Sequence, residues 1–122
     1  MVLSRRSTLI TFCCLIAVTF SVATANDTRS FRVEVSGTGR PILLIPGLAS
    51  SGDTWATTVA HLRSRFTCHV FTLAGFAGTS PIDGPLFTTV QKDLAEYIRE
   101  HRLEHPIVIG HSLGGMLAMA LA

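Results

Sequence analysis

A serine stands between two glycines near the end of the 122-residue sequence, in the run Gly110-His111-Ser112-Leu113-Gly114. This run fits the pattern Gly-x-Ser-x-Gly, in which a serine hydroxyl attacks a carbonyl carbon as a nucleophile. A five-residue pattern often matches by chance, and a serine between glycines is commonly just part of a turn. The elements on either side of the run therefore decide between a nucleophile and an ordinary turn serine.

The flanking sequence favours the nucleophile. The apolar run 107–109 is typical of a buried strand, and the apolar segment 113–122 is typical of a helix. A strand-to-helix turn this tight strains the backbone of its central residue and lifts its side chain above the sheet. Strand and helix touch at the positions of Gly110 and Gly114, which must therefore be small. We predict that Ser112 is a catalytic nucleophile at such an elbow.

The rest of the chain predicts the elements that would position this serine. Alternation of apolar and polar residues at 31–35 predicts a half-buried strand. Continuous apolar runs predict strands buried on both faces, and amphipathic segments predict helices between them. The predicted strands are 42–45, 68–73 and 107–109, and the predicted helices begin at an N-cap Asp53, at Thr88 or Thr89, and at Leu113. Buried strands alternating with helices indicate an α/β fold, with a mostly parallel sheet and helices on both faces.

Three segments of the sequence resemble the α/β-hydrolase superfamily, in its esterase, lipase and peroxidase-like branches. They are 43–48 (Leu-Leu-Ile-Pro-Gly-Leu), 73–80 (Leu-Ala-Gly-Phe-Ala-Gly-Thr-Ser) and 108–115 (Val-Ile-Gly-His-Ser-Leu-Gly-Gly). The last segment is highly specific and the other two are moderately so. The resemblance covers residues 31–122 and implies the α/β-hydrolase fold, with a serine hydrolase of esterase or lipase type as its activity.

The resemblance assigns the first segment to the oxyanion loop. Family members usually carry His-Gly after this strand, whereas this sequence has Pro46-Gly47. Because the stabilising groups are backbone amides, the proline does not remove the function. The resemblance implies that the N–H groups of Leu48 and Leu113 form the oxyanion hole. A plain turn at Pro46-Gly47 is the alternative.

The second segment resembles the family loop Asp-x-x-Gly-x-Gly-x-Ser. Thr72 occupies the usual position of the aspartate, and Ala77 separates Phe76 from Gly78. In the family that aspartate is structural, so its replacement does not bear on catalysis. It does make a finer family assignment less specific.

The base and the acid of a catalytic triad have no candidate in the expected place. In this fold the order along the chain is serine, then Asp or Glu, then His. The residues after Leu113 contain no Asp, Glu or His, and the histidines 61, 69, 101, 105 and 111 all come before Ser112. Asp53 and Asp83 are better interpreted as cap and turn residues. We expect the upstream histidines and acids not to form the triad.

The end of the sequence also bears on completeness. Residue Ala122 falls inside an apolar helix, and no Gly, Asn or basic residue closes that helix. We expect a chain truncated after the nucleophile elbow. The alternative to an enzyme is a catalytically inactive truncated remnant, or a non-enzymatic binding module that reuses the fold.

The N-terminus has the order of features of a secretory signal peptide. Arg5 and Arg6 precede the uncharged apolar stretch 9–20, and Ala23-Thr24-Ala25 provides a small-x-small cleavage site before Asn26. An uncleaved membrane anchor is the alternative, but about a dozen apolar residues are short of the roughly 20 that span a bilayer. The predicted parts are a signal peptide at 1–25 and the N-terminal part of an α/β-hydrolase domain at 26–122. We expect an exported protein, periplasmic or secreted, without a stable membrane span after cleavage.

Composition excludes several function classes. Hydrophobic residues make up 48 % of the chain, which excludes a disordered protein. After the predicted cleavage, eight basic residues (10 less Arg5 and Arg6) balance eight acidic ones. A chain near zero charge offers no basic stripe for nucleic acid. Cys68 is the only cysteine after residue 25, and no metal-type Cys/His spacing occurs. We therefore expect no metal, no cofactor and no nucleic acid, and a small-molecule, ester-like substrate.

Overall fold

Strands and helices alternate along the chain in the computed structural model, which describes residues 29–122. In order they are β1 (Phe31–Gly37), β2 (Arg40–Ile45), the 3-10 helix η1 (Gly52–Trp55), α1 (Ala56–Leu62), β3 (Phe66–Leu73), α2 (Leu86–Glu100), β4 (Ile107–Gly110) and α3 (Leu113–Leu121). The predicted order of strands and helices is confirmed. The predicted signal peptide and its cleavage site lie outside the described residues.

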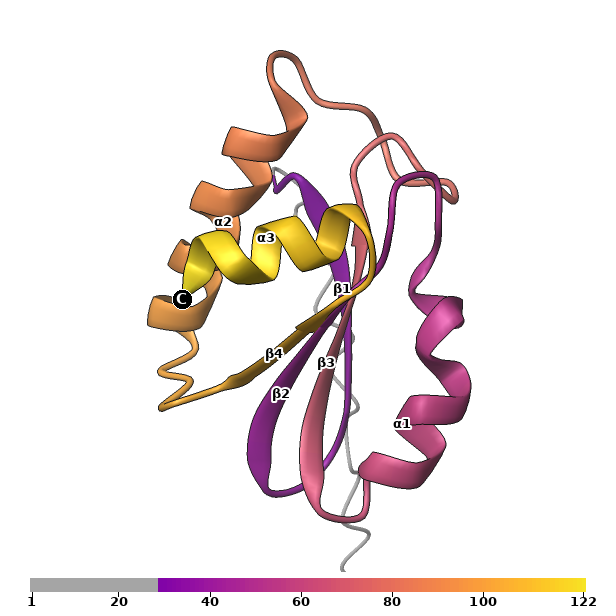
Figure 1. Cartoon of the computed structure of the whole chain (residues 1–122), viewed down its shortest axis with the longest axis vertical. Coiled ribbons are helices and arrows are strands. Elements are labelled where there is room, and N and C mark those ends of the chain that lie inside the picture. The colour runs from indigo at the N-terminus through magenta and orange to yellow at the C-terminus, as the bar shows by residue number, and fades with distance from the viewer. Residues whose placement is uncertain (1–28) are drawn as a thin grey trace, which may run out of the picture.

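The four strands form one sheet in the order β1-β3-β2-β4. β1 is antiparallel to β3, while β2 runs parallel to both β3 and β4. The carboxyl ends of the three parallel strands therefore meet at one edge of the sheet, where the loops after β2 and β3 and the turn from β4 into α3 lie (Figure 1). Ile45 at the end of β2 pairs with Gly110 at the end of β4. This register brings the Pro46-Gly47 loop beside the serine turn.

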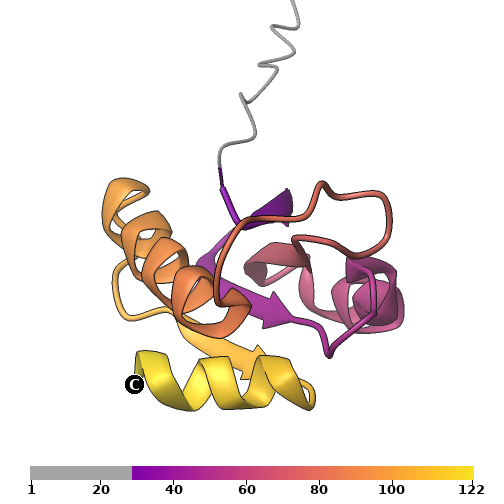
Figure 2. The same cartoon turned by 90° about the horizontal axis from the view of Figure 1, so that it is seen from above.

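The predicted buried strand at the centre of the sheet has both faces covered. Leu43 and Ile45 pack in a cluster with α2 and α3, whereas Ile42 and Leu44 pack in a cluster with α1. All four side chains are at most 2 % exposed. Figure 2 shows α1 on one side of the sheet and α2 with α3 on the other. A continuous apolar run is the pattern that such a two-sided position demands.

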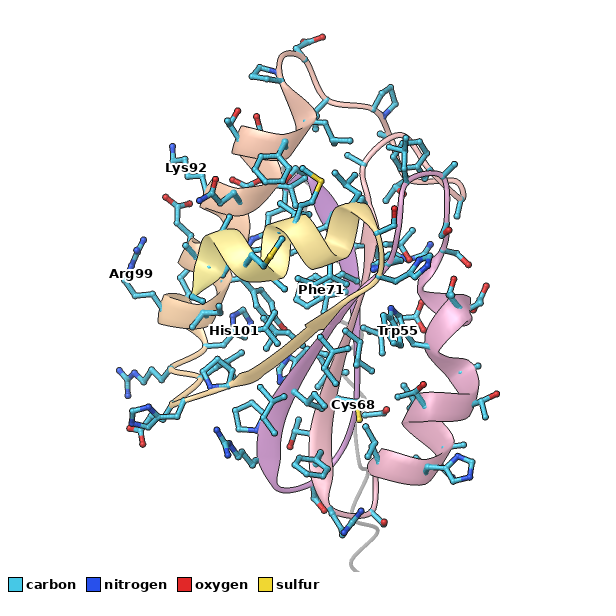
Figure 3. The ribbon with its side chains drawn as sticks, viewed as in Figure 1. Trp55, Cys68, Phe71, Lys92, Arg99 and His101 are labelled. Carbon is cyan, nitrogen blue, oxygen red and sulfur yellow. The ribbon has the colours of Figure 1, made fainter. Side chains whose placement is uncertain are left out.

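Helix α2 confirms the predicted amphipathic pattern. Val90, Leu94 and Tyr97 are buried against the sheet. Lys92 and Arg99 point away from the sheet (Figure 3). Burial of the apolar stripe fixes α2 on the face of the sheet from which α3 also approaches.

Two predicted helix starts are wrong. Ser51, not Asp53, is the N-cap of the first helical segment, and its hydroxyl accepts a hydrogen bond from the Asp53 amide at 3.3 Å. α2 begins at Leu86, earlier than Thr88 or Thr89. The Thr89 hydroxyl donates to the Pro85 carbonyl at 2.9 Å from inside the first turn. In both places a polar side chain within the first turn resembles a cap in sequence.

Helix α3 is apolar on its exposed side as well as on its packed side. Leu117 is buried against the sheet, while Met116 and Met119 are 54 % and 74 % exposed. Ile109 on β4 is also 37 % exposed, and within residues 29–122 β4 pairs only with β2. None of the helices formed by residues 29–122 has the length and apolar character needed to cross a membrane.

Candidate active site

Ser112 occupies the turn between β4 and α3, where it is the N-cap residue of α3. Its backbone angles are φ 51° and ψ −116°, a conformation that side-chain-bearing residues rarely adopt. The turn leaves no room for a relaxed residue, because β4 ends at Gly110 and α3 begins at Leu113. The side chain of Ser112 is exposed at the carboxyl edge of the sheet. This is the geometry that lets a serine hydroxyl meet a substrate from solvent.

Both glycines of the motif are required by space, for two different reasons. A Cβ at Gly110 would overlap the backbone of Gly114 and Gly115 in the first turn of α3. A Cβ at Gly114 would overlap the Ile45 carbonyl and lie 2.6 Å from the carbonyl oxygen of Pro46. The first glycine lets the helix fold back onto its own strand, and the second lets the helix rest on the end of β2.

The two predicted oxyanion amides lie at neighbouring loops. Leu113 is the first residue of α3, so its N–H belongs to the group that has no partner within the helix. Leu48 follows Gly47, and a Cβ on Gly47 would lie 3.4 Å from the Cβ of Ser112. The positive end of the α3 dipole adds to the attraction for an anion at this place. The arrangement can stabilise negative charge that develops beside Ser112.

A threonine near the end of β3 is hydrogen-bonded to the start of η1, in the segment after β2. Thr72 is buried, and its hydroxyl accepts a hydrogen bond of 2.9 Å from the Gly52 amide. In the loop after β3, the Thr79 hydroxyl donates to the carbonyl of Leu73, the last residue of the strand, at 2.9 Å. Thr72, at the position where the family usually has aspartate, thus supplies a structural acceptor. The hydrogen bond to Gly52 was missed from the sequence because it joins residues 20 apart.

Three histidines upstream of Ser112, His61, His69 and His101, contact groups elsewhere in the fold. Nδ1 of His61 lies 2.7 Å from the Thr57 carbonyl oxygen on its own helix. Nδ1 of His69 lies 2.8 Å from the Tyr97 hydroxyl inside the core. Burial, with the nearby charge of His101, lowers the pKa of His69. In residues 29–122 none of these side chains hydrogen-bonds the Ser112 hydroxyl.

Within the described part of the chain, neither a metal-binding cluster nor a reactive cysteine is present. Residues 29–122 hold no group of three or more His, Cys, Asp or Glu side chains that could bind a metal ion. Cys68 is fully buried on the α1 side of the sheet (Figure 3), and burial raises the pKa of its thiol. A thiol in that state is a poor nucleophile.

A family model described as the alpha/beta hydrolase family matches residues 42–122, which include both loops and the elbow. The chain belongs to the alpha/beta hydrolase family. The resemblance of the sequence to this family and the expected fold are thereby confirmed. The match begins at Ile42 in β2 and runs through Ser112, so the elements that surround the candidate site are those of the family.

Among relatives in this family, the chain is 29 % identical over 89 residues to the pimeloyl-[acyl-carrier protein] methyl ester esterase of Vibrio cholerae, covering 73 % of this chain and 33 % of that protein. The solved structure of a marine microorganism esterase superposes with a TM-score of 0.70 at 27 % identity, covering 77 % of this chain and 36 % of that one. An alpha/beta hydrolase from Sphaerobacter thermophilus gives a TM-score of 0.64 at 25 % identity, covering 74 % and 35 %. The chain thus spans about a third of the length of the relatives it matches.

Proposed function

We propose that the protein is a serine hydrolase that cleaves a carboxylic ester, thioester or amide through an acyl-enzyme on Ser112. The observation that supports this most strongly is the backbone of Ser112. An exposed serine is held at φ 51° at the N-cap of a helix, between two glycines where an added Cβ would clash with backbone atoms. Such a backbone conformation has a cost in stability. Such strain persists where it serves the placement of a reacting group.

The chemistry follows from the position of the groups. The Ser112 oxygen attacks the carbonyl carbon while a base takes its proton, and the carbonyl oxygen becomes an oxyanion beside the N–H groups of Leu113 and Leu48. Collapse of this intermediate breaks the bond to the alcohol, thiol or amine, which leaves with the proton. Water then attacks the acyl-enzyme in the same way and releases the carboxylic acid. The two amides stabilise the charge in both steps.

The base of this reaction is proposed to be a histidine oriented by Asp or Glu, both contributed by a part of the full-length protein outside residues 1–122. Two observations support this. The relatives are about three times longer than the matched segment. His61 and His69 are engaged away from Ser112, with the Thr57 carbonyl and the Tyr97 hydroxyl. In this fold the acid and the histidine follow the nucleophile along the chain.

Export is the second part of the proposal. Residues 1–25 carry the charge, apolar run and cleavage site of a signal peptide. Cleavage between Ala25 and Asn26 would leave Asn26 three residues before Arg29, close to the start of the first strand. Mass spectrometry of exported protein should find Asn26 as the first residue. An N-terminal peptide that retains the apolar run would contradict it.

The test of the hydrolase uses the full-length protein with Ser112→Ala. In a subtilisin triad, loss of the nucleophile costs on the order of 10⁶ in kcat. Wild type should be labelled by a fluorophosphonate probe and should hydrolyse p-nitrophenyl acetate, whereas Ser112→Ala should do neither. Ser80→Ala, which changes an exposed loop serine, is the matched control and should behave as wild type. Equal labelling of wild type and Ser112→Ala would overturn the assignment, and an unreactive wild type would favour a non-enzymatic protein.

A further inference from the structure

The loop after β2 and the elbow after β4 interlock at two points. Below, Gly114 rests on the carbonyl groups of Ile45 and Pro46. Above, the side chain of His111 lies against Gly47, so that a Cβ on Gly47 would lie 3.0 Å from Nδ1 of His111. The backbone of His111 is fixed as well, because its amide donates to the Ile45 carbonyl at 3.1 Å. The β2 loop is thus held between the first turn of α3 and the His111 imidazole.

The segment held in this way is the one that carries a proposed oxyanion donor. Gly47 is buried and Leu48, the next residue, is 60 % exposed. The Ser50 amide closes the turn by donating to the Gly47 carbonyl at 3.3 Å, and Ala49 has a φ of 58°. The direction of the Leu48 N–H therefore depends on the peptide plane that begins at Gly47.

We propose that His111 is a positioning residue for the oxyanion hole, which rests on the proposed function of Ser112. Its imidazole packs on Gly47 and keeps the Gly47–Leu48 peptide turned toward the hydroxyl of the neighbouring Ser112. Among the described residues the His111 side chain makes no hydrogen bond, so the effect is steric, and bulk at position 111 matters more than its nitrogen atoms. In this role His111 acts through the Leu48 amide, and the role does not require it to take the proton from Ser112.

The first experiment measures kcat and KM of the full-length protein, together with the rate of labelling by the fluorophosphonate. Displacement of a donor by about 1 Å can cost up to 10²-fold in rate. His111→Ala should lower kcat and the labelling rate roughly 10- to 100-fold and change KM less than about threefold. His111→Phe keeps a flat ring against Gly47 and should restore kcat to within a few-fold of wild type. A kcat of His111→Ala equal to wild type, or a His111→Phe variant as slow as His111→Ala, would overturn the proposal.

The second experiment is a double-mutant cycle. Gly47→Ala pushes a methyl group to 3.0 Å from His111 Nδ1 and should lower both kcat and the melting temperature. Adding His111→Ala should recover part of the melting temperature that Gly47→Ala loses, since the clash is removed. Additive effects of the two changes would show that the residues do not touch and would sink the interlock. Because this readout is thermal, it still decides the contact if Ser112 proves unreactive in wild type, which is the outcome that ends the proposed function.

Discussion

Two polar residues of the chain, Ser112 and His69, lie in opposite kinds of surroundings. Ser112 is exposed, strained in its backbone, and flanked by glycines. His69 is 4 % exposed and sits in a regular strand, where Nδ1 contacts the Tyr97 hydroxyl and Nε2 meets no partner within residues 29–122. The ring of His101 stacks on Tyr97, with centroids 4.0 Å apart. Beside this cluster lies a pocket of about 580 Å³.

The difference shows that two common guides to an active site diverge in this molecule. A pocket lined by a histidine of shifted pKa is a standard candidate, and it points to His69. Strained backbone at a helix N-terminus points to Ser112. The cause of the pKa shift of His69 is chiefly burial in the core, which any structural histidine would share. The turn at Ser112 instead places an exposed hydroxyl at the carboxyl edge of the sheet, so the candidate site is assigned from this geometry.

The largest expected effect comes from filling the space at the elbow. Gly110→Val places side-chain atoms in the backbone of α3, and Gly114→Val places them in the end of β2. Overpacking costs roughly 1–3 kcal/mol, and more where backbone cannot yield. Both variants of the full-length protein should melt at lower temperature and lose labelling at Ser112. A variant that keeps the wild-type melting temperature and activity would show that the elbow is not built as described.

The next largest effect is expected at His69, where a substitution should lower the stability of the fold without changing the reactivity of Ser112. His69→Ala removes a buried ring from the cluster with Tyr97 and should lower the free energy of unfolding by about 2 kcal/mol, the low end for a large-to-small core change. Under conditions where the variant is folded, its rate of labelling at Ser112 should equal that of wild type. Chemical denaturation and probe labelling measure the two quantities. Labelling slowed as much as in Ser112→Ala would move the candidate site to the His69 pocket.

A smaller effect is expected from acid. Burial, helped by the nearby charge of His101, lowers the pKa of His69 below its ordinary value of 6.5. As the pH falls below about 6.5, the unfolded chain binds a proton at His69 that the folded chain refuses, so folding weakens from that pH downward through the folded pKa. Above pH 6.5 this contribution is fully present. Denaturant midpoints from pH 8 to pH 4.5 should fall less steeply for His69→Leu than for wild type, and parallel curves would contradict the assignment.

The smallest effect is expected one residue beyond the motif. A Cβ on Gly115 would meet only the Gly110 carbonyl, at 3.4 Å, which is ordinary contact. Alanine is also about 1 kcal/mol better than glycine inside a helix. Gly115→Ala should therefore melt within a few degrees of wild type and keep its labelling rate. This variant is the matched control for Gly110→Val and Gly114→Val, and a collapse like theirs would mean that the whole turn rejects side chains.

Much of the fold could be predicted from local sequence. Continuous apolar runs at 42–45 and 68–73 predicted strands, since a strand covered on both faces must be apolar along its whole length. Periodicity predicted α2. Helix starts were less predictable, because Asp53 and Thr89 are residues that often cap helices but lie inside the first turn.

The candidate site was predictable only in part. Ser112, Gly110 and Gly114 stand within five residues, so their spacing carries the geometry of one turn. The requirement for glycine at position 114 could be predicted only in part from the sequence. The carbonyl groups that exclude a side chain there belong to Ile45 and Pro46, about 70 residues earlier in the chain. Contacts of this kind depend on strand order and register, which no local pattern encodes.

Two exposed methionines on α3 allow its solvent exposure in the full-length protein to be measured by oxidation. The 122 residues contain three methionines, Met1, Met116 and Met119, and the last two present their sulfur-bearing side chains outward from α3. Exposed thioethers oxidise readily to sulfoxides, whereas covered ones are protected. Brief peroxide treatment of the full-length protein, followed by peptide mass analysis, will therefore measure how exposed α3, the helix that follows Ser112, is to solvent. Slow oxidation at Met119 would indicate that other parts of the full-length protein cover it. Rapid oxidation would indicate that this face of the helix is exposed to solvent.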